Sequence, residues 1–137
     1  MIMPDLHGLN IDAVRALPDG EPVVMVNLVR LRARSLDGDG TGWDAYQRYS
    51  AAVIKLIKAR GGTILWAGNA DAVAFGGAEA NRWDYVVLVR YPSRAAFLDM
   101  MTSADYAAAN RHRVNGAEDH VILATREAYS KFAAQQR

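Results

Sequence analysis

The sequence contains no cysteine, and this absence removes several kinds of chemistry at once. Disulfide bonds, thiolate nucleophiles and cysteine-based zinc or iron–sulfur sites are all excluded. The three histidines show neither H-x-H nor H-E-x-x-H spacing, and the G-x-S-x-G turn of serine hydrolases is missing. We therefore expect no metal and no cofactor, with a single histidine ligand to haem as the one option that the spacing leaves open.

Charge of a prevailing sign and long hydrophobic runs are also missing. Lys and Arg number 16 against 15 for Asp and Glu, a net charge of +1, which gives no field that would attract nucleic acid or an acidic membrane. Uninterrupted apolar runs reach about five residues, whereas a membrane-spanning helix needs roughly 20. Residues 1–10 contain Asp5 and no apolar stretch of the kind a signal peptide has. These absences predict a cytoplasmic protein without a nucleic-acid or membrane partner.

The length and composition are those of one globular domain. The chain has 137 residues, of which 51% are hydrophobic and 23% charged. We expect a single domain over residues 1–137, with a core at about 22–125. A short N-terminal helix and a helical C-terminal tail would flank this core.

In the first half of the chain the residue patterns predict a short helix, a strand and a long helix. The short helix follows Asn10, a possible cap, with apolar residues at helical spacing. Residues 22–31 are β-branched and nearly continuously apolar, which is typical of a strand covered on both faces. The long helix begins at a capping box formed by Thr41 and Asp44 and ends at Gly61-Gly62.

The second half completes a βαββαβ order. Residues 73–77 either continue the second strand or form an irregular connection. The other expected elements are strands at 63–67, 83–91 and 120–125, a helix capped by Ser93, a helix from Ser103 to about residue 114, and a helical tail from Glu127. This order predicts a sheet with two helices on one face.

The loop at residues 37–42 (DGDGTG) admits two interpretations, a flexible turn or a ligand loop. Asp37 and Asp39 match the start of a calcium loop, but Arg48 stands where that loop needs a bidentate Glu. A phosphate loop would need a Gly-Lys pair, which is missing. The turn is the preferred interpretation.

Both faces of the predicted sheet are apolar, although two helices can cover only one of them. Successive residues of a strand point to opposite faces, and a face in water would be polar. In the third strand one face carries Tyr85, Val87 and Val89, and the other carries Val86 and Leu88. A second copy packed sheet to sheet would cover the open face, so we expect a homodimer.

The order and spacing of these segments resemble a known family. Four segments carry the resemblance: PVVMVNLVRLRA, the tyrosine-bearing helix that ends at Gly61-Gly62, WDYVVLVRYPSRAAF and ADYAAANRHR. Over about residues 22–125 the chain resembles the family called domain of unknown function 1330, which belongs to the dimeric α/β-barrel superfamily. The positions that match its pattern are Asn27, Tyr49, Gly61, Gly62, Tyr91, Pro92, Tyr106 and Arg113.

This resemblance implies a fold of the α+β class. Its protomer would be a ferredoxin-like βαββαβ unit with an antiparallel sheet and helices on one face, and two protomers would form a dimeric α/β barrel. A pocket would lie between sheet and helices. Relatives in the superfamily include cofactor-free monooxygenases, small-ring isomerases and haem-binding enzymes, while the family itself carries no settled reaction. The insert at 37–42 and the N-terminal helix depart from the family pattern and would cover or reshape the mouth of the pocket.

Asn27 is the one polar residue in the middle of an apolar strand. A buried amide without a partner costs a few kcal/mol, so Asn27 must bond either to the protein or to a ligand.

On the last long helix, Tyr106, Asn110 and Arg113 share a face. Arg113 would suit a carboxylate or an enolate, or would pair with an acidic side chain at the helix end. His112 points away from this face by a quarter to a third of a turn.

Two hypotheses follow, an enzyme and a non-catalytic ligand-binding or sensing dimer. In the enzyme, Asn27 and Tyr106 bond a developing oxyanion and Arg113 neutralises it, while His112 or a tyrosine moves a proton. In both cases the ligand is a small organic anion, carbonyl or phenol compound. The candidate catalytic residues are Tyr106, Arg113 and His112, and the candidate ligand-binding residues are Asn27, Tyr49, Tyr91 and Asn110. Tyr49 and Tyr91 are also interpretable as core aromatics with their hydroxyls at its edge.

Overall fold

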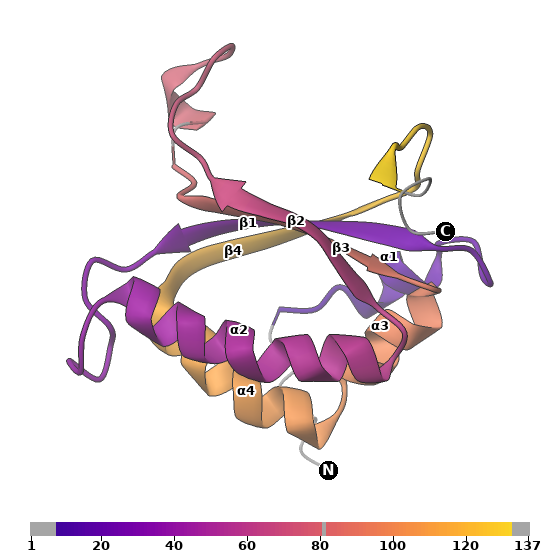
Figure 1. Cartoon of the computed structure of the whole chain (residues 1–137), viewed down its shortest axis with the longest axis horizontal. Coiled ribbons are helices and arrows are strands. Elements are labelled where there is room, and N and C mark those ends of the chain that lie inside the picture. The colour runs from indigo at the N-terminus through magenta and orange to yellow at the C-terminus, as the bar shows by residue number, and fades with distance from the viewer. Residues whose placement is uncertain (1–7, 81, 133–137) are drawn as a thin grey trace.

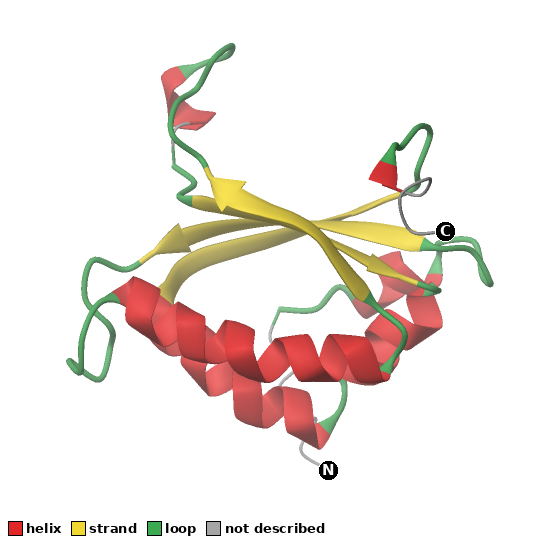
Figure 2. Cartoon of the chain, in the orientation of Figure 1, coloured by secondary structure: helices red, strands yellow, loops and turns green. Residues whose placement is uncertain are grey.

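A four-stranded antiparallel sheet covered on one side by helices forms the body of the molecule (Figures 1 and 2). The computed structural model describes residues 8–80 and 82–132. The strand order is β2-β3-β1-β4, and every neighbouring pair is antiparallel. The elements are α1 (Ile11–Arg15), β1 (Val23–Leu31), α2 (Gly42–Ala59), β2 (Thr63–Asn69), a short 3-10 helix (Ala78–Ala80), β3 (Tyr85–Tyr91), α3 (Arg94–Met101), α4 (Ala104–Gly116) and β4 (Ala117–Thr125). The predicted βαββαβ order is confirmed.

The helix starts follow the local signals in the sequence. At α2 the Thr41 hydroxyl accepts from the Asp44 N–H at 3.1 Å, and the Asp44 carboxylate accepts from the Thr41 N–H at 2.9 Å. Gly61 follows the end of α2 with φ +76°, a left-handed conformation that glycine adopts without strain. Ser93 and Ser103 cap α3 and α4 through their hydroxyls, as predicted.

Two local expectations were wrong, and the structure decides between the two alternatives of a third. Asn10 precedes α1 without a side-chain capping bond, and its backbone (φ −89°, ψ 78°) lacks the extended conformation of an N-cap. Residues 73–77 form the irregular connection rather than a continuation of β2, and Gly76 (φ +124°) turns the chain within it as it leaves the sheet (Figure 1). The tail was expected to be helical from Glu127, but residues 126–131 are irregular and helix appears only at residue 132; the part from 133 on lies outside the described residues.

The core lies between the sheet and the helices. It is built from both layers: Val23, Met25, Val29, Tyr46, Tyr49, Val53, Ile57, Val89, Tyr91, Phe97, Met100 and Tyr106. At one end α2 and α4 approach so closely that a side chain on Gly116 would clash with the Gly42 carbonyl, and its Cβ would lie 2.8 Å from the Tyr46 nitrogen. Glycine at both positions therefore allows the two helix ends to meet.

The register of the strands decides which residues face the helices. Asn27 of β1 pairs with Val87 of β3 and Ile122 of β4, and all three lie on the covered face with Met25. The opposite face carries two apolar rows that run across the sheet: Trp66, Leu88, Val26 and Leu123 in one, and Gly68, Val86, Leu28 and Val121 in the other. No described element lies over this open face, and the connection at 70–84 and the chain after β4 both rise on its side (Figure 1).

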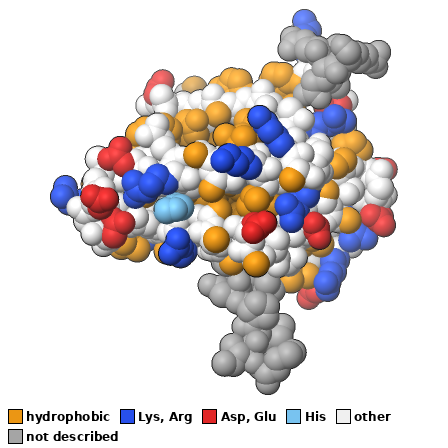
Figure 3. Space-filling view, turned by 60° about the horizontal axis from the view of Figure 1, so that its bottom comes forward, with side chains coloured by type: hydrophobic (Ala, Val, Ile, Leu, Met, Phe, Trp, Pro, Cys, Tyr) orange, Lys and Arg blue, Asp and Glu red, His pale blue; other side chains and the backbone are white. Residues whose placement is uncertain are grey.

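The outer surface of the helical layer is mixed in character. Basic, acidic and apolar side chains are interspersed on it, and neither sign of charge forms a continuous field (Figure 3). Within the described residues, no helix is long and apolar enough to cross a membrane.

Candidate functional site

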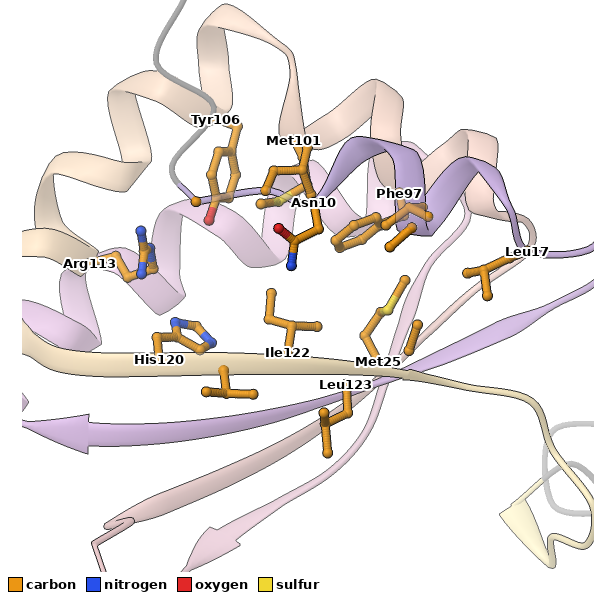
Figure 4. Close-up of a pocket in the computed structure, with 16 residues that line it drawn as sticks. Asn10, Leu17, Met25, Phe97, Met101, Tyr106, Arg113, His120, Ile122 and Leu123 are labelled. Atoms are coloured by element: carbon orange, nitrogen blue, oxygen red, sulfur yellow. The ribbon is translucent and has the colours of Figure 1, made fainter.

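A cavity of about 410 Å³ lies between α1, α3 and α4 on one side and β1 and β4 on the other (Figure 4). Polar side chains gather at one end of it, where Tyr106 and Arg113 of α4 approach His120 of β4. The other end is apolar, with Leu17 and Phe97 among its lining residues. A concave, mostly apolar space with a few converging polar groups is the usual form of a small-molecule site.

His120 is held at the polar end through one ring nitrogen. It lies on the covered face, diagonal to Asn27 on the neighbouring strand, and its Nε2 is 2.9 Å from the Asn27 Oδ1. The Asn27 Nδ2 donates to the carbonyls of Met25 and Val87, each at 3.2 Å. These two bonds fix the orientation of the amide, so Oδ1 is the atom that faces the imidazole. Because an amide oxygen only accepts, Nε2 carries the hydrogen and Nδ1 carries the lone pair.

The Nδ1 atom of His120 is buried and has no hydrogen-bond partner among the described residues. Burial, first of all, and then the nearby positive charge of Arg113 lower the pKa of His120 from 6.5 to about 3, against a smaller opposing effect of Asp119. The imidazole is therefore neutral at physiological pH. Its Nδ1 is a hydrogen-bond acceptor that the protein leaves unsatisfied, which is rare in a folded structure and needs an explanation.

Arg113 enters the cavity from α4 with one side of its guanidinium already fixed. Its Nε donates to the Asn110 Oδ1 at 2.6 Å, which orients the plane of the group. No carboxylate in the described parts of the chain pairs with Arg113, so the expected alternative of an acidic partner at the helix end is not seen there. The two terminal nitrogens, which form a fork suited to a carboxylate, are free of ion pairs within those parts.

The tyrosine hydroxyls form a buried network behind this end of the cavity. The hydroxyls of Tyr106 and Tyr49 lie 2.9 Å apart, so the Tyr49 hydroxyl is inside the core rather than at its edge. Burial, together with the neighbouring Tyr106, raises the pKa of Tyr49 well above its ordinary value. Tyr91 is also buried, which raises its pKa, and its hydroxyl donates to the Met100 sulfur at 3.9 Å. The Tyr49 and Tyr91 phenols are therefore neutral hydrogen-bonding groups.

The candidate residues from the sequence divide between two adjoining cavities. Tyr106 and Arg113 line the larger cavity, while Tyr49, Tyr91 and Asn27 line a second one of about 210 Å³. The two cavities share the side chains of Met25, Phe97, Met101 and Ile122. Asn110 stands behind Arg113, and His112 lines neither cavity.

His120 was not among the candidates. The signal that would have found it is the same as for Asn27, a polar residue on the covered face of an apolar strand, at the start of β4. The local sequence does not show this signal clearly, because charged residues directly precede His120 and make it look like a strand end.

Two other possible ligand sites, the DGDGTG loop and a metal centre, have less support in the structure. Asp37 of the DGDGTG loop accepts from the Ser35 hydroxyl at 2.7 Å, the Asp39 N–H at 2.9 Å and the Asn115 side chain at 2.9 Å. These bonds, first of all that of Ser35, lower the pKa of Asp37, and they occupy its carboxylate in a turn tied to α4. Over residues 8–80 and 82–132, no three His, Asp or Glu side chains are grouped closely enough to hold a metal ion.

The fold is that of a ferredoxin-like α+β protein, with a cavity of small-molecule size between sheet and helices. The chain belongs to the family described as Domain of unknown function (DUF1330), whose model matches residues 39–126. A crystal structure of a protein of unknown function from Rhodopseudomonas palustris is 32% identical, with a TM-score of 0.78 over 88% of this chain and 92% of that one. The predicted family resemblance is confirmed.

More distant solved structures share the fold alone. A dimeric ferredoxin-like protein of unknown function from Bacteroides fragilis is 12% identical, with a TM-score of 0.53 over 77% of this chain and 96% of that one. The hydroxynitrile lyase of Passiflora edulis is 15% identical, with a TM-score of 0.55 over 81% of this chain and 99% of that one. These likenesses confirm the expected ferredoxin-like fold. No protein in a search of curated sequences matches.

Proposed function

We propose that this protein is a cofactor-independent enzyme that moves a proton on a small carbonyl or phenol compound bound in the larger cavity. The observation that carries the proposal is the buried, unpartnered Nδ1 of a neutral His120 beside Arg113. Within the described residues His120 has an unsatisfied acceptor and Arg113 has no ion pair, and both lie in a mostly apolar cavity. This arrangement fits a ligand that brings a proton and a developing negative charge.

The chemistry assigns different roles to the two groups. Removing a proton from a phenol, or from a carbon next to a carbonyl, leaves negative charge on oxygen. His120 takes the proton at Nδ1, while Arg113 stabilises the oxyanion with its terminal N–H groups. Tyr106, whose hydroxyl is paired with that of Tyr49, can add a further hydrogen bond. Asn27 acts through His120 as a positioning residue, because it holds the tautomer that leaves Nδ1 free to accept.

This assignment moves the base from His112 to His120. His112 was the histidine expected to carry a proton, but it lines neither cavity. His120 projects from β4 into the same space as Arg113 (Figure 4). A base must lie within hydrogen-bond reach of the proton it removes, so position favours His120.

The functional unit that we propose is a homodimer joined through the open sheet face. Two apolar rows lie on that face, and the segments that rise beside it carry Phe75 and Tyr129, which are 98% and 80% exposed. Contiguous apolar surface of this kind is uncommon on monomers. The Bacteroides fragilis protein with the same fold is described as dimeric, which supports the proposal.

A non-catalytic ligand-binding dimer is the second candidate, and the pKa of His120 favours it. With a pKa of about 3, His120 is a good hydrogen-bond acceptor but a weak base. Binding without proton transfer would use the same residues. The two candidates differ only in whether the bound compound exchanges a proton.

An NMR experiment on the full chain separates them. With ¹⁵N-labelled histidine at pH 7, we expect a protonated Nε2 and an unprotonated Nδ1 on His120, and a change at Nδ1 when a small phenol or ketone binds. For the enzyme, ketones that bind should also gain deuterium from D₂O, and His120→Gln should abolish this gain. Binding without exchange would favour the second candidate, and ligands that leave the His120 signals unchanged would refute the site.

A further inference from the structure

Resting on the proposed function, we infer the class of its substrate: a 2-oxo acid with an apolar side chain, whose carboxylate binds Arg113 while His120 removes a proton from carbon 3. Each part of this molecule matches a feature of the cavity: the carboxylate, the enolisable carbon and the apolar group. The three matches are independent of one another.

Arg113 is the reason for placing a carboxylate on the substrate. The guanidinium is planar and forms its strongest hydrogen bonds to a carboxylate that accepts two N–H groups at once. Its Nε already donates to the Asn110 side chain, so the two terminal nitrogens are the donors that remain for a carboxylate. The chain supplies no carboxylate for them within its described residues. An anionic ligand would provide the partner that the fold leaves out.

The lining at the far end of the cavity is the reason for giving the substrate an apolar side chain. Away from Tyr106, Arg113 and His120 the lining is mainly aliphatic and aromatic, with the Asn10 amide as one further polar group, and it includes Leu9, Leu17, Met25, Phe97 and Ile122. A volume of about 410 Å³ falls in the lower part of the range of small-ligand sites. The space suits a phenyl ring or a branched alkyl chain attached to a short polar head.

The enolisable carbon is assigned by His120. Among the described residues Nδ1 of His120 has no hydrogen-bond partner, whereas Nε2 is held by Asn27. The imidazole lies at the polar end of the cavity beside Arg113, where the proposal places the carbon next to the carbonyl (Figure 4). In the step, the C3–H bond breaks and the proton goes to Nδ1. The bonding pair becomes the C2–C3 double bond, and the negative charge moves to the ketone oxygen beside Arg113. Return of the proton to carbon 3 or to oxygen completes the exchange, so no oxidant or reductant is needed.

The anion and the base are coupled through Arg113. The charged and titratable groups that face His120 are Arg113 from α4, Asp119 from its own strand and Tyr46 from α2, which burial keeps neutral. The charge of Arg113 opposes protonation of the imidazole. A carboxylate that pairs with Arg113 cancels this opposition, so the acid makes His120 a stronger base and a neutral ketone does not.

The Nδ1 atom of His120 has almost no exposed area. A ligand can therefore reach it only after a neighbouring side chain shifts. Pairing with the carboxylate would move Arg113, whose side chain is only partly buried. Binding of the anion and access to the base would then be one event.

The experiment compares phenylpyruvate with benzyl methyl ketone, in which a methyl group replaces the carboxylate. Deuterium entry is followed by ¹H NMR in D₂O, with buffer background subtracted, and binding is followed by saturation transfer. We expect the wild-type chain to accelerate exchange at carbon 3 of phenylpyruvate by about 100-fold, the lower range for a general base. The ketone should remain near background. Arg113→Gln should abolish the acceleration, and Arg111→Gln, an exposed cation two positions away on the same helix, should keep it.

The outcomes separate the two proposals. If the ketone exchanges as fast as the acid and Arg113→Gln has no effect, the substrate class is wrong while the proposed function stands. If phenylpyruvate binds but does not exchange, proton removal is wrong and the site is a binding site. If neither compound binds or changes the His120 signals, both proposals fail. Exchange lost in His112→Gln and kept in His120→Gln would overturn the assignment of the base.

Discussion

The two faces of the sheet are made from the same strands but differ in their polar residues. The covered face includes Asn27 on the inner strand β1 and His120 on the edge strand β4, joined by one hydrogen bond. The open face has two rows that are apolar on every strand, and its charged residues, such as Arg30 and Arg90, stand nearer its ends. Both faces are rich in apolar residues, and valine is common on each of them. Hydrophobicity alone therefore does not distinguish them.

The two faces differ in how strictly each one determines what can pack or bind against it. An apolar face can associate with any complementary apolar surface, and its polar rim sets the orientation. A buried polar pair is different, because each member must be satisfied or it costs stability. Asn27 is fully bonded, whereas His120 is bonded on one side only. The incomplete half of this pair is the feature of the covered face on which the proposed site rests.

The largest expected effect comes from placing a charge on each face at adjacent positions of β3. Leu88 lies in the open rows, and Val89 is 4% exposed beneath the helices. Val89→Lys should prevent folding, because burying an unpaired ammonium costs several kcal/mol. Leu88→Lys should keep the fold and halve the mass measured by light scattering, from twice 15.0 kDa to once that value.

Circular dichroism provides the control for both variants. A folded Leu88→Lys chain that remains dimeric would show that the open face is not the interface. A folded Val89→Lys chain would show that the covered face is less tightly packed than its burial indicates.

The next effect is a pH dependence that only the covered face can produce. The pKa of His120 is about 3 in the folded chain and 6.5 in the unfolded chain, so between these values the unfolded state binds more protons. Stability is therefore unaffected above about pH 6.5 and falls as the pH drops toward 3, by up to about 1.4 kcal/mol per pH unit. Urea unfolding at one protein concentration, from pH 7.5 to 4, measures the slope. His120→Gln should flatten it, and an equal slope in that variant would assign it to other groups.

A smaller effect tests the hydrogen bond between Asn27 and His120 by a double-mutant cycle. Asn27→Leu leaves the Nε2–H without an acceptor, and His120→Phe leaves the amide oxygen without a donor, at about 1–3 kcal/mol each. The double variant replaces both groups by apolar ones, so it should be destabilised by less than the sum. Additive losses, measured as free energies of unfolding, would contradict a direct coupling of the two side chains.

The same pair shows how far the sequence alone could lead. The Thr41–Asp44 capping box was predictable because all of its atoms lie within one helical turn. Asn27 was also predictable as a residue that needs a partner. The partner itself stands 93 positions along the chain, and the two meet only through the β1–β4 register, which local patterns do not determine.

The position of Arg113 was predictable from helical spacing, since Tyr106, Asn110 and Arg113 do share a face. The division into two cavities was not predictable. It depends on how Phe97 and Met101 of α3 fill the space between sheet and helices, and such packing has no local signature.

The smallest expected effect concerns the hydroxyl pair of Tyr49 and Tyr106 beneath the covered face. Tyr49→Phe removes one partner of a buried 2.9 Å hydrogen bond, which should lower the free energy of unfolding by about 1 kcal/mol. Tyr129→Phe is the matched control, because its side chain is 80% exposed and should change stability by less than about 0.5 kcal/mol. Tyr49→Phe also tests function, because Tyr49 would act on a ligand in the larger cavity only through Tyr106. A loss of stability with unchanged deuterium exchange would make the pair structural. Unchanged stability with slower exchange would mean that Tyr49 serves to orient the Tyr106 hydroxyl toward the oxyanion.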